Sequence, residues 1–422
     1  MIENLLKDKN ILLGITGSIS AYKALELIRL YVKAGANVKV VMSEASQKFI
    51  TTLSVETLSK NRVLIESNED WTTDNNHIKV TQWADLFVIA PCSANTIAKL
   101  ANAIADNLLL QCALAYSKLK LIAPAANTNM LNHPITQANL KLLGVTNHKI
   151  IQTQTKELAC ESVGDGALAE PLEIFYQSAS ELLKDEFWSN RRVIVSGGGS
   201  IEKIDDVRFV SNFSSGKMAS SIALALHLRG ADVNFISSKF PDTLPKDLHT
   251  LHVESSLEMM GYLQDSIRIA KKGVMKNVTL TNELHQPQLI QKEPFLFMVA
   301  AVSDYVPTFP QSGKLKKEML GENYSLEMKQ NIDIVGSLNK DGIKTVSFKA
   351  EFEEATAFEN AKKSLSQKGV DGVCLNILNN NSFGSETNEI ELILKEKSIK
   401  LTPNKKLPLA FELLHVIGKE FE

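Results

Sequence analysis

Apolar segments alternate with helical patterns in two series along this chain, and this alternation constrains its fold more than any other feature. In the first series the apolar segments are residues 10–16 (NILLGIT), 37–43 (NVKVVMS), 84–91 (ADLFVIAP) and 118–125 (KLKLIAPA). Helical periodicity covers residues 21–35 and returns near Asn95 and after Pro134. A strand that is apolar throughout has to be covered on both faces. These segments therefore predict a parallel sheet with helices on each side.

The same pattern starts again in the C-terminal half. After a charged segment with helical periodicity at residues 182–192, apolar segments follow at residues 191–196, 232–237, 295–305, 345–351 and 372–378, with a helical pattern over 217–231. A chain of 422 residues is also too long for one ordinary core. We predict an α/β protein with two Rossmann-like (flavodoxin-like), doubly wound parallel-sheet domains in series, residues 1–190 and 191–422. The polar stretch from Gly261 to Pro294 has weak periodicity and is predicted to be an insertion.

The composition favours a cytoplasmic enzyme that acts on small molecules. With 46 basic and 48 acidic side chains the net charge is -2, which gives no electrostatic reason to expect a nucleic acid or an anionic membrane as partner. No apolar run reaches the ~18 residues of a membrane-spanning helix, and the first residues are too charged for a signal peptide. The four cysteines, Cys92, Cys112, Cys160 and Cys374, form neither a C-x-x-C metal pair nor a disulfide framework.

Small residues follow two of the predicted strands in the first half. Gly17, Ser18 and Ile19 come after the first strand, and residues 90–96 (APCSANT) lead from a strand end into a helix start. In doubly wound sheets, ligands bind beyond the carboxyl ends of the strands, where helix N-termini present free N–H groups to phosphate. The first loop alone fits a tight turn equally well. The second loop repeats its geometry, which favours a shared phosphate or ring site, with Cys92 as a small buried neighbour.

Three polar residues of the first half are further candidates for function. His77 precedes a predicted helix, Asn127 follows a predicted strand, and Cys160 lies in a segment rich in glycine and acidic residues. Taken singly, the histidine fits a solvated or capping residue, the asparagine a turn residue, and the cysteine a buried filler. The surroundings of Cys160 offer little to pack against, which favours an exposed thiol on a mobile loop that is able to donate a proton.

A second loop suited to anions lies in the other half. Residues 208–218 (RFVSNFSSGKM) place hydroxyls, a glycine and a lysine between basic ends, yet they do not match the G-x-x-x-x-G-K-[ST] phosphate loop. The residues predict an anion site without saying which anion it holds.

Taken together, the motifs resemble a known family. The first half resembles the flavin-containing cysteine decarboxylases, and the whole chain is similar to bacterial fusions of phosphopantothenoylcysteine decarboxylase with phosphopantothenate-cysteine ligase. In order, the motifs are GITGSISAYK, HIKVTQWAD, APCSANTIAKLANAIADNLL, PAANTNM, LACESVGDGALAEP, DVRFVSNFSSGKM, AAVSDY, KLKK and NIDIV. Each is weak alone, and their joint order is specific.

For the first domain, the resemblance implies FMN and a decarboxylation in which flavin oxidation of the substrate thiol supplies the electron sink. It implies that His77 and Asn127 hold the substrate and that Cys160, on a flap, returns a proton. The residues expected to line FMN are Gly17, Ser18, Ile19, Ser43, Ser93, Ala94, Asn95 and Thr96.

For the second domain, the resemblance implies a ligase that activates 4'-phosphopantothenate with CTP as an acyl-cytidylate, which the amine of cysteine attacks. Asn212 is expected to contact the acyl-cytidylate, Asp304 to meet the triphosphate with Mg²⁺, and Lys314 to neutralise developing charge. For Lys314 itself, an exposed charge run is the alternative interpretation. The residues expected to bind CTP are Met298, Val299, Ala300, Asp304, Lys314, Ile332, Asp333, Ile334, Val335, Phe348, Ser364 and Lys368. Those expected at the substrate are Arg208, at a phosphate, and Asn212, Ser214, Ser215, Lys217 and Ala301.

Some positions depart from the pattern of the family. Residues 200–208 read SIEKIDDVR where the family has T-R-E-P-I-D-P-V-R, so Lys203 and Asp206 stand at two proline positions. Ser364 stands where a lysine is common, with Lys363 adjacent. The resemblance also implies a homo-oligomer with a trimeric flavin domain and a dimeric ligase domain, which together close into a dodecamer.

Two other functions fit parts of the chain. The first is a flavodoxin-like electron carrier, which needs neither a Cys160 flap nor a second domain. The second is an NAD(P)-dependent oxidoreductase with two Rossmann domains. Against it, the glycine loops GITGSIS (residues 14–20) and VSGGGSIEKI (residues 195–204) both miss the G-x-G-x-x-G pattern, and no acidic ribose-binding residue follows the second strand.

Overall fold

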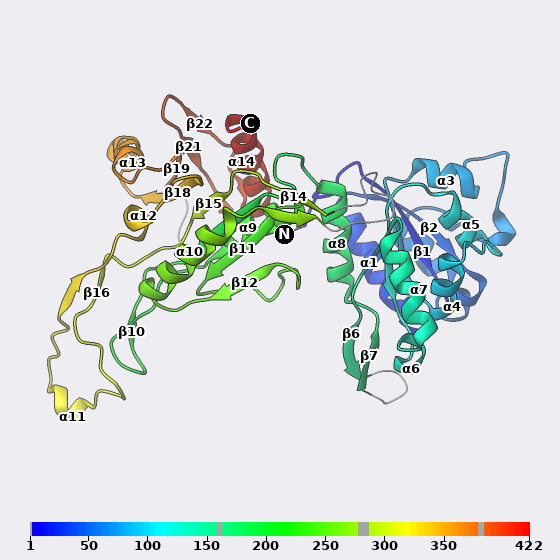
Figure 1. Cartoon of the computed structure of the whole chain (residues 1–422), viewed down its shortest axis with the longest axis horizontal. Coiled ribbons are helices and arrows are strands. Elements are labelled where there is room, and N and C mark those ends of the chain that lie inside the picture. The colour runs from blue at the N-terminus through cyan, green and yellow to red at the C-terminus, as the bar shows by residue number, and fades with distance from the viewer. Residues whose placement is uncertain (1, 158–162, 277–286, 379–383) are drawn as a thin grey trace. The chain divides into compact units, whose positions relative to one another are not determined.

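The computed structural model (Figure 1) describes residues 2–157, 163–276, 287–378 and 384–422, without the side chains of Lys276, Lys317, Met319 and Glu354. The chain divides into two compact units. The first contains Ile2–Leu183 and Lys276–Gln288, and the second contains Lys184–Met275 and Leu289–Glu422. Each unit has its own sheet and its own core.

A five-stranded parallel sheet with the order β2-β1-β3-β4-β5 forms the centre of the first unit. This is the flavodoxin-like order, in which the winding direction reverses between β1 and β3. The strands are β1 (Asn10–Ile15), β2 (Asn37–Met42), β3 (Leu86–Cys92), β4 (Lys120–Pro124) and β5 (His148–Ile150). All five residues of β1 after Asn10 and all residues of β3 and β4 are buried, as a doubly covered sheet requires.

Helices cover both faces of this sheet. The helices α3, α4, α5 and α7 share one apolar cluster with Leu12, Phe87 and Ile122 of the sheet. On the other face α1 and α8 pack together, and the Tyr31 hydroxyl contacts the Ser178 Oγ at 2.6 Å. The helices are α1 (Tyr22–Lys33), α2 (Thr52–Ser59), α3 (His77–Trp83), α4 (Ala94–Ala101), α5 (Leu108–Ala115), α6 (Thr128–Leu131), α7 (Pro134–Val145) and α8 (Pro171–Leu183). Short 3-10 turns (Ile19–Ala21, Glu44–Lys48, Glu66–Asn68) and a ribbon of β6 (Gln154–Glu157) and β7 (Val163–Ala167) complete the unit.

The second unit is built on a larger, mixed sheet with the order β12-β11-β8-β15-β18-β19-β21-β22. Its first six strands are parallel and run in the 3-2-1-4-5-6 order of a Rossmann fold, with the reversal between β8 and β15. Two antiparallel strands extend one edge. The strands are β8 (Arg192–Gly197), β11 (Asp232–Ser237), β12 (His249–His252), β15 (Phe295–Met298), β18 (Lys344–Glu351), β19 (Gly372–Ile377), β21 (Glu391–Ile393) and β22 (Ser398–Lys400).

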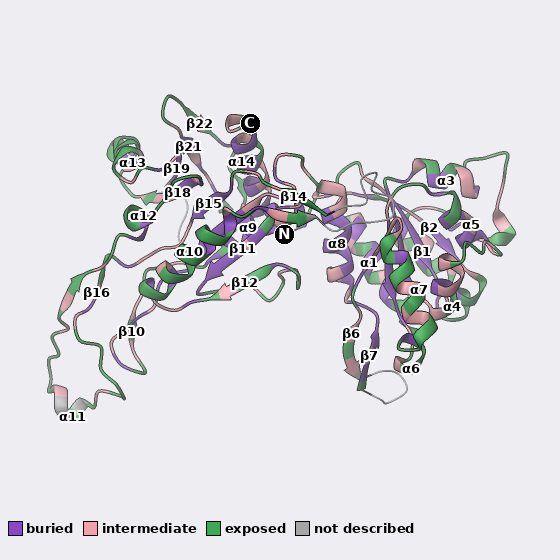
Figure 2. Ribbon diagram, viewed as in Figure 1, coloured by how far each residue is buried: buried purple, intermediate pink, exposed green. Residues whose placement is uncertain are grey.

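The second sheet is likewise covered on both faces, and its strands are the buried layer in Figure 2. Apolar residues of α10 and α12 pack on Ile194 and Leu296, and α13 packs on Val373 and Leu375. The helices are α9 (Lys217–Leu228), α10 (Ser256–Ala270), α11 (Lys317–Leu320), α12 (Ile334–Ser337), α13 (Glu354–Gln367) and α14 (Lys406–Glu420). Four two-stranded ribbons are β9 (Glu202–Lys203) with β10 (Phe209–Val210), β13 (Val274–Lys276) with β14 (Gln288–Ile290), β16 (Tyr305–Pro307) with β17 (Met328–Gln330), and β20 (Thr387–Asn388) with β23 (Asn404–Lys405).

The predicted fold class is confirmed, and three local predictions are wrong. The strand predicted over residues 295–305 ends at Met298, because the next residues turn to bond the loop after β8. The insertion predicted from Gly261 begins inside α10, whose Leu263, Ile267 and Ala270 are buried in the core. A helical pattern was predicted over residues 182–192, but α8 ends at Leu183, so most of this segment is not helical.

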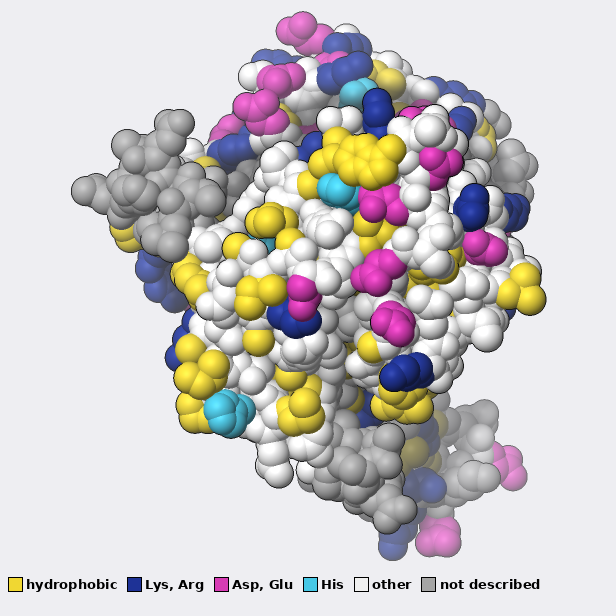
Figure 3. All heavy atoms as spheres, turned by 90° about the vertical axis from the view of Figure 1, so that its right-hand side faces the viewer, with side chains coloured by type: hydrophobic (Ala, Val, Ile, Leu, Met, Phe, Trp, Pro, Cys, Tyr) yellow, Lys and Arg dark blue, Asp and Glu magenta, His cyan; other side chains and the backbone are white. Residues whose placement is uncertain are grey.

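Charges of both signs are interspersed with apolar side chains on the face that Figure 3 draws. This mixed surface agrees with the balanced composition. Within the described ranges, each helix falls short of the length and apolar character that crossing a membrane requires.

The side chain of Trp188 packs in the core of the second unit. Its side chain is fully buried, and its indole N–H donates to the Leu414 carbonyl at 3.1 Å. Its ring lies edge-on to Phe187 and Phe295, with centroids at 4.8 and 5.1 Å. Residues just before Asn190 therefore belong to the core of the second unit. Whether the domains separate at the predicted boundary stays a prediction.

We expect a fragment of residues 184–422 to be more stable than a fragment of residues 191–422. Loss of a buried Trp side chain costs about 3–5 kcal/mol, and about 2–4 °C per kcal/mol is typical at this size. The shorter fragment should therefore melt roughly 6 °C or more below the longer one, as followed by circular dichroism. Equal melting temperatures would show that Trp188 does not support this core.

Candidate active sites

In the first unit, one hydroxyl joins the two loops at the point where the winding reverses. Thr16, directly after β1, donates from its Oγ1 to the Pro91 carbonyl at 2.8 Å and accepts from the Ser93 N–H at 2.9 Å. Its own N–H also donates to Pro91. The loops after β1 and β3 are therefore held together at the edge where doubly wound sheets bind ligands.

The residues predicted to line FMN lie along this edge. A Cβ on Gly17 would come within 2.7 Å of the Ala45 Cβ, so only glycine lets the first loop approach the loop after β2 this closely. Ser18 caps the short turn that follows, and Ile19 is 57% exposed at its start. The buried Oγ of Ser43 is one of the described side-chain atoms without a hydrogen-bond partner. An unpaired buried hydroxyl beside a small-residue loop fits a polar ligand such as FMN.

The second loop is shaped by a helix cap. Ser93 is the N-cap of α4 and accepts from the Thr96 N–H at 3.3 Å, while the two hydroxyls lie 3.1 Å apart. Ala94 and Asn95 form the first turn of that helix. The loop therefore presents hydroxyls and helix N–H groups next to Thr16, an arrangement suited to an anion.

His77 lies at the start of α3, where Glu69 holds it. The His77 Nδ1 and Glu69 Oε1 are 2.7 Å apart, and the His77 N–H donates to the same oxygen at 3.2 Å. Trp71 lies edge-on to the imidazole with centroids at 5.3 Å. The carboxylate fixes the ring orientation and leaves Nε2 as the ring nitrogen available to a ligand.

Asn127 is exposed at the start of α6 and accepts from the Asn129 N–H at 2.9 Å. The β6–β7 ribbon packs against this loop. A Cβ on Gly164 would lie 1.8 Å from the Thr128 Oγ1, and one on Gly166 would lie 1.9 Å from the Ala126 carbonyl oxygen. Both glycines are thus required for the contact. Cys160, predicted to lie on a flap, is outside the described residues.

The base of the ribbon is fixed by charge. Glu170 pairs with the buried Lys23 of α1 and with Lys156 of β6, each at 3.0 Å. Burial opposes ionisation of Glu170, but hydrogen bonds from Lys156 and Lys23 hold its pKa below the usual range. Burial likewise lowers the pKa of Lys23. This pairing ties the ribbon to the helix that follows the Gly17 loop.

In the second unit, serine hydroxyls join two loops at the edge of the sheet, as the Thr16 hydroxyl does in the first unit. The Ser196 Oγ, in β8, accepts from the N–H groups of Val299 and Ala300 at 3.1 and 3.3 Å. Ser200 accepts from the Ser303 N–H at 3.1 Å, and the Ala301 N–H donates to the Gly198 carbonyl at 2.8 Å. The loops after β8 and β15 are therefore held together at the reversal of this sheet.

A polar cavity of about 550 Å³ lies beside that edge. Its walls include ten of the twelve residues predicted to bind CTP, namely Met298, Ala300, Asp304, Ile332, Asp333, Ile334, Val335, Phe348, Ser364 and Lys368. Asp333 caps α12 through the Gly336 N–H at 3.1 Å and pairs with Lys368 at 3.4 Å. Of the remaining two, Val299 lines a neighbouring cavity, and Lys314 is exposed on a loop.

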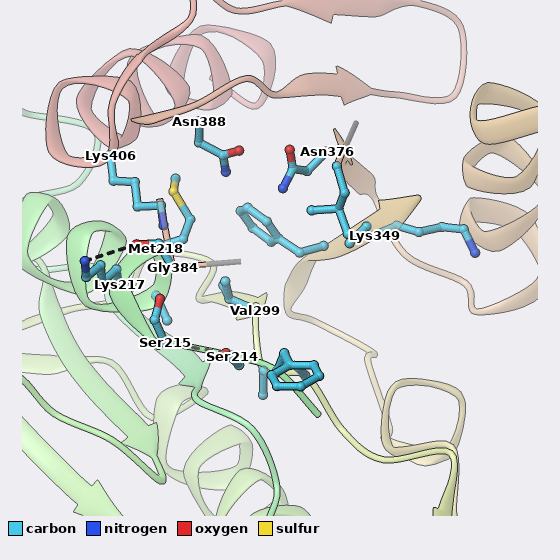
Figure 4. Close-up of a pocket in the computed structure, with 18 of the residues that line it drawn as sticks. Ser214, Ser215, Lys217, Met218, Val299, Lys349, Asn376, Gly384, Asn388 and Lys406 are labelled. Carbon is cyan, nitrogen blue, oxygen red and sulfur yellow. Dashed lines mark hydrogen bonds between the residues drawn. The ribbon is translucent and has the colours of Figure 1, made fainter. Parts of the chain in front are cut away.

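The neighbouring cavity, of about 220 Å³, is drawn in Figure 4. Four predicted substrate residues, Ser214, Ser215, Lys217 and Ala301, line it at the start of α9 and after β15. Sequence reasoning missed Asn376, Asn388 and Lys406, which also line it. Figure 4 shows both amide groups facing the cavity, and the Oδ1 of Asn376 is buried without a partner. The Lys349 ammonium points away and pairs with Glu351 at 3.2 Å.

Positive charge gathers on one side of this cavity. Lys217 donates to the Gly384 carbonyl at 3.1 Å and pairs with the Glu386 carboxylate. Burial, together with the charge of Lys217, lowers the pKa of Lys406. Two ammonium groups and the N-terminus of α9 make the cavity suited to an anionic ligand, whereas the unpaired Asn376 Oδ1 is able to accept from a donor group of that ligand.

The structure gives Asn212 and Arg208 partners that the sequence did not indicate. The Nδ2 of Asn212 donates to the Val302 carbonyl at 2.9 Å, and the N-cap of α9 is Gly216, so Asn212 does not cap that helix. The Arg208 guanidinium bonds the Asp205 carboxylate at 3.0 and 2.6 Å and the Leu315 carbonyl at 2.8 Å. Arg208 thus contacts the loop that carries Lys314.

The residues of the candidate sites that sequence reasoning missed differ in whether the sequence could have indicated them. Thr16 and Ser196 stand at strand ends beside residues that were singled out, so a search for hydroxyls at the sheet reversal would have found them. Glu69 lies only eight residues before His77, but no pattern in the sequence marks it as the partner of the imidazole, and Asn376 and Lys406 lie far along the chain from their neighbours in space. Only the folded chain brings them to the sites.

Comparison with known proteins agrees with this division. Residues 2–182 match the family model "Flavoprotein", and residues 188–278 and 268–420 match "DNA/pantothenate metabolism flavoprotein C-terminal domain". The Coenzyme A biosynthesis bifunctional protein CoaBC of Haemophilus influenzae is 34% identical over 424 residues, covering 99% of each chain. The protein of that name in Bacillus subtilis is 32% identical over 423 residues, covering 98% of each. The solved "FMN binding protein AtHal3" is 34% identical, with 41% of this chain and 95% of that chain covered and a TM-score of 0.37. The chain therefore belongs to the family of coenzyme A biosynthesis bifunctional proteins CoaBC.

Proposed function

We propose that this protein catalyses two steps of coenzyme A biosynthesis. In the first, the unit after Leu183 joins cysteine to 4'-phosphopantothenate with CTP through an acyl-cytidylate. In the second, the unit before it decarboxylates the product, 4'-phospho-N-pantothenoylcysteine, to 4'-phosphopantetheine with FMN. The observation that carries the proposal is the match to CoaBC over 99% of both chains, because it gives each unit a counterpart. An electron carrier or an NAD(P)-dependent oxidoreductase would not account for that match.

In the first unit, Gly17, Ser18, Ser43 and the Ser93 loop would hold FMN. The unpaired Ser43 hydroxyl and the close approach of Gly17 to Ala45 support this assignment, and Ile19 and Thr96 lie at the same edge. When bound, FMN supplies the electron sink that loss of a cysteine carboxylate requires. The His77 imidazole, oriented by Glu69, and Asn127 would hold the substrate at this edge. Cys160 would donate the proton to the carbon that lost the carboxylate, which is the carbon bonded to nitrogen.

In the second unit, the two cavities divide the acyl-cytidylate between them. They share three wall residues, Ala300, Phe348 and Lys349, so a ligand that crosses from one to the other passes this wall. The larger cavity would hold the cytidine nucleotide. The smaller cavity would hold 4'-phosphopantothenate, with its phosphate near Lys217 and Lys406. The reacting carboxylate and the α-phosphate would then meet near Ala300.

Mg²⁺ would join this site through the nucleotide. Asp304 is an exposed carboxylate in the wall of the larger cavity, and no cluster of three or more metal-ligating side chains occurs among the described residues. One carboxylate suits Mg²⁺, which usually binds through one or two carboxylates plus substrate phosphates. Lys314 would neutralise charge that develops during the transfer.

Self-association is also part of the proposal. Apolar side chains are exposed on both units, including Met130, Ile135 and Leu142 on the first and Phe209 and Phe213 on the second. We propose that such side chains contribute to a homo-oligomer in which the first unit is trimeric and the second unit dimeric, as in the expected dodecamer.

The Cys160→Ser variant should separate the two activities. Hydroxyl protons transfer far less readily than thiol protons, so we expect this variant to release CO₂ and stop at a product with fewer hydrogens than 4'-phosphopantetheine. Ligation should continue at the wild-type rate. Mass spectrometry of the product and a CTP-dependent ligation assay measure the two effects. Normal yield of 4'-phosphopantetheine would exclude Cys160 as the proton donor.

The Asn212→Asp variant should lose ligation, the activity proposed for the second unit. A carboxylate cannot donate to the Val302 carbonyl as the amide does, and it would add a negative charge beside an acyl-phosphate. We expect ligation to fall at least ~10-fold, equivalent to about 1.4 kcal/mol in the barrier, while decarboxylation of supplied substrate is unchanged. The Asn212→Gln variant keeps the donor and serves as control. Near-normal turnover in Asn212→Asp would remove Asn212 from the site.

A further inference from the structure

The loop that carries Lys314 is held on both sides of that residue. The Gly313 N–H donates to the Asp206 Oδ2 at 2.7 Å, and its carbonyl accepts from the Asp206 N–H at 3.3 Å. The Leu315 N–H donates to the Asp205 Oδ2 at 3.1 Å, and its carbonyl accepts from the Arg208 Nη2 at 2.8 Å. The backbone groups of both neighbours of Lys314 are therefore fixed, while its side chain is exposed.

Asp205 is the centre of this arrangement. Its side chain is buried, yet its carboxylate accepts from the Val207 and Arg208 N–H groups at 2.9 and 2.7 Å, in addition to the Arg208 guanidinium and Leu315. Burial opposes ionisation, but these hydrogen bonds, led by Arg208, hold the pKa of Asp205 far below its usual range. A carboxylate with this many donors is a rigid anchor.

The same hairpin also carries Asn212. Residues 202–203 and 209–210 form the β9–β10 ribbon, and Glu202 in it accepts from the Ser256 N–H of α10 at 3.0 Å. Asn212 follows directly and bonds Val302 in the loop after β15. One hairpin, fixed to a core helix, thus sets the positions of both Asn212 and the Lys314 loop.

Asp206 makes both bonds to Gly313. Proline stands at this position in the family pattern, and proline has neither a backbone N–H nor a carboxylate. Neither of the two Asp206 bonds to Gly313 is available to such a residue.

We propose that Asp205, Asp206 and Arg208 form a backbone clamp that positions Lys314 for the ligase reaction. These are positioning residues, because they act on the backbone beside Lys314. The proposal rests on the function proposed for Lys314. A lysine neutralises developing charge best when its location is set before the reaction, and a loop pinned at both neighbours provides that location. Contact between Arg208 and a phosphate is not needed for this role.

The test compares four variants of the full-length protein, Asp206→Ala, Asp206→Asn, Lys314→Ala and the Asp206→Ala/Lys314→Ala double variant. Asp206→Ala should lower the ligation kcat about fivefold or more, with KM for CTP and 4'-phosphopantothenate within about twofold. Asp206→Asn keeps an acceptor for Gly313 and should restore most of kcat. In the Lys314→Ala background, removal of Asp206 should have no further effect, because residues that act as a unit are not additive.

Two controls accompany these variants. Asp242→Ala, at an exposed aspartate outside the clamp, should leave ligation unchanged, and decarboxylation should be normal in every variant. If the losses of Asp206→Ala and Lys314→Ala multiply, or if decarboxylation and melting temperature fall as well, the clamp is excluded and the function of Lys314 stands. If Lys314→Ala ligates at the wild-type rate, the function proposed for Lys314 fails, and the clamp fails with it.

Discussion

The sites of both units depend on one constraint, the joining of two loops where the winding of the sheet reverses. Adjacent strands there send their helices to opposite faces, so their loops diverge and leave a crevice. In the first unit the Thr16 hydroxyl bonds Pro91 and Ser93 across that crevice. In the second unit Ser196 and Ser200 bond the loop after β15. These hydroxyls hold the two loops of each unit together, and in the first unit the Thr16 hydroxyl bonds the N-cap residue of α4.

In each unit, an antiparallel ribbon also contacts a loop of the candidate site. The β6–β7 ribbon is tied to the Asn127 loop by Gly164 and Gly166, where any side chain would collide. The β9–β10 hairpin holds Asn212 and, through Asp205, the backbone beside Lys314. Parallel sheets thus form the edges of the candidate sites, and antiparallel ribbons hold neighbouring loops in place.

The sequence predicted the parallel core well because strands buried on both faces leave a continuous apolar pattern. The small-residue loops at Gly17 and Ser93 were predicted for the same reason, since each follows such a strand. Residues 295–305 were predicted as one strand because apolar residues continue past Met298, although Ser196 draws the chain out of the sheet there. Asn376 and Lys406 could not be predicted, because they reach their cavity from distant segments. The partners of Arg208 were also hidden, since a basic residue near hydroxyls fits a phosphate as well as a carboxylate.

The central claim is that one chain carries out CTP-dependent ligation and FMN-dependent decarboxylation in sequence. It is tested most directly by incubating the full-length wild-type protein with 4'-phosphopantothenate, cysteine, CTP and Mg²⁺ and following all products by mass. The account predicts a flavin-coloured protein that forms 4'-phosphopantetheine, with CMP and pyrophosphate released in step with it. No product should form when CTP is omitted, whereas supplied 4'-phospho-N-pantothenoylcysteine should be decarboxylated without CTP. A protein that consumes neither CTP nor 4'-phospho-N-pantothenoylcysteine would contradict the account.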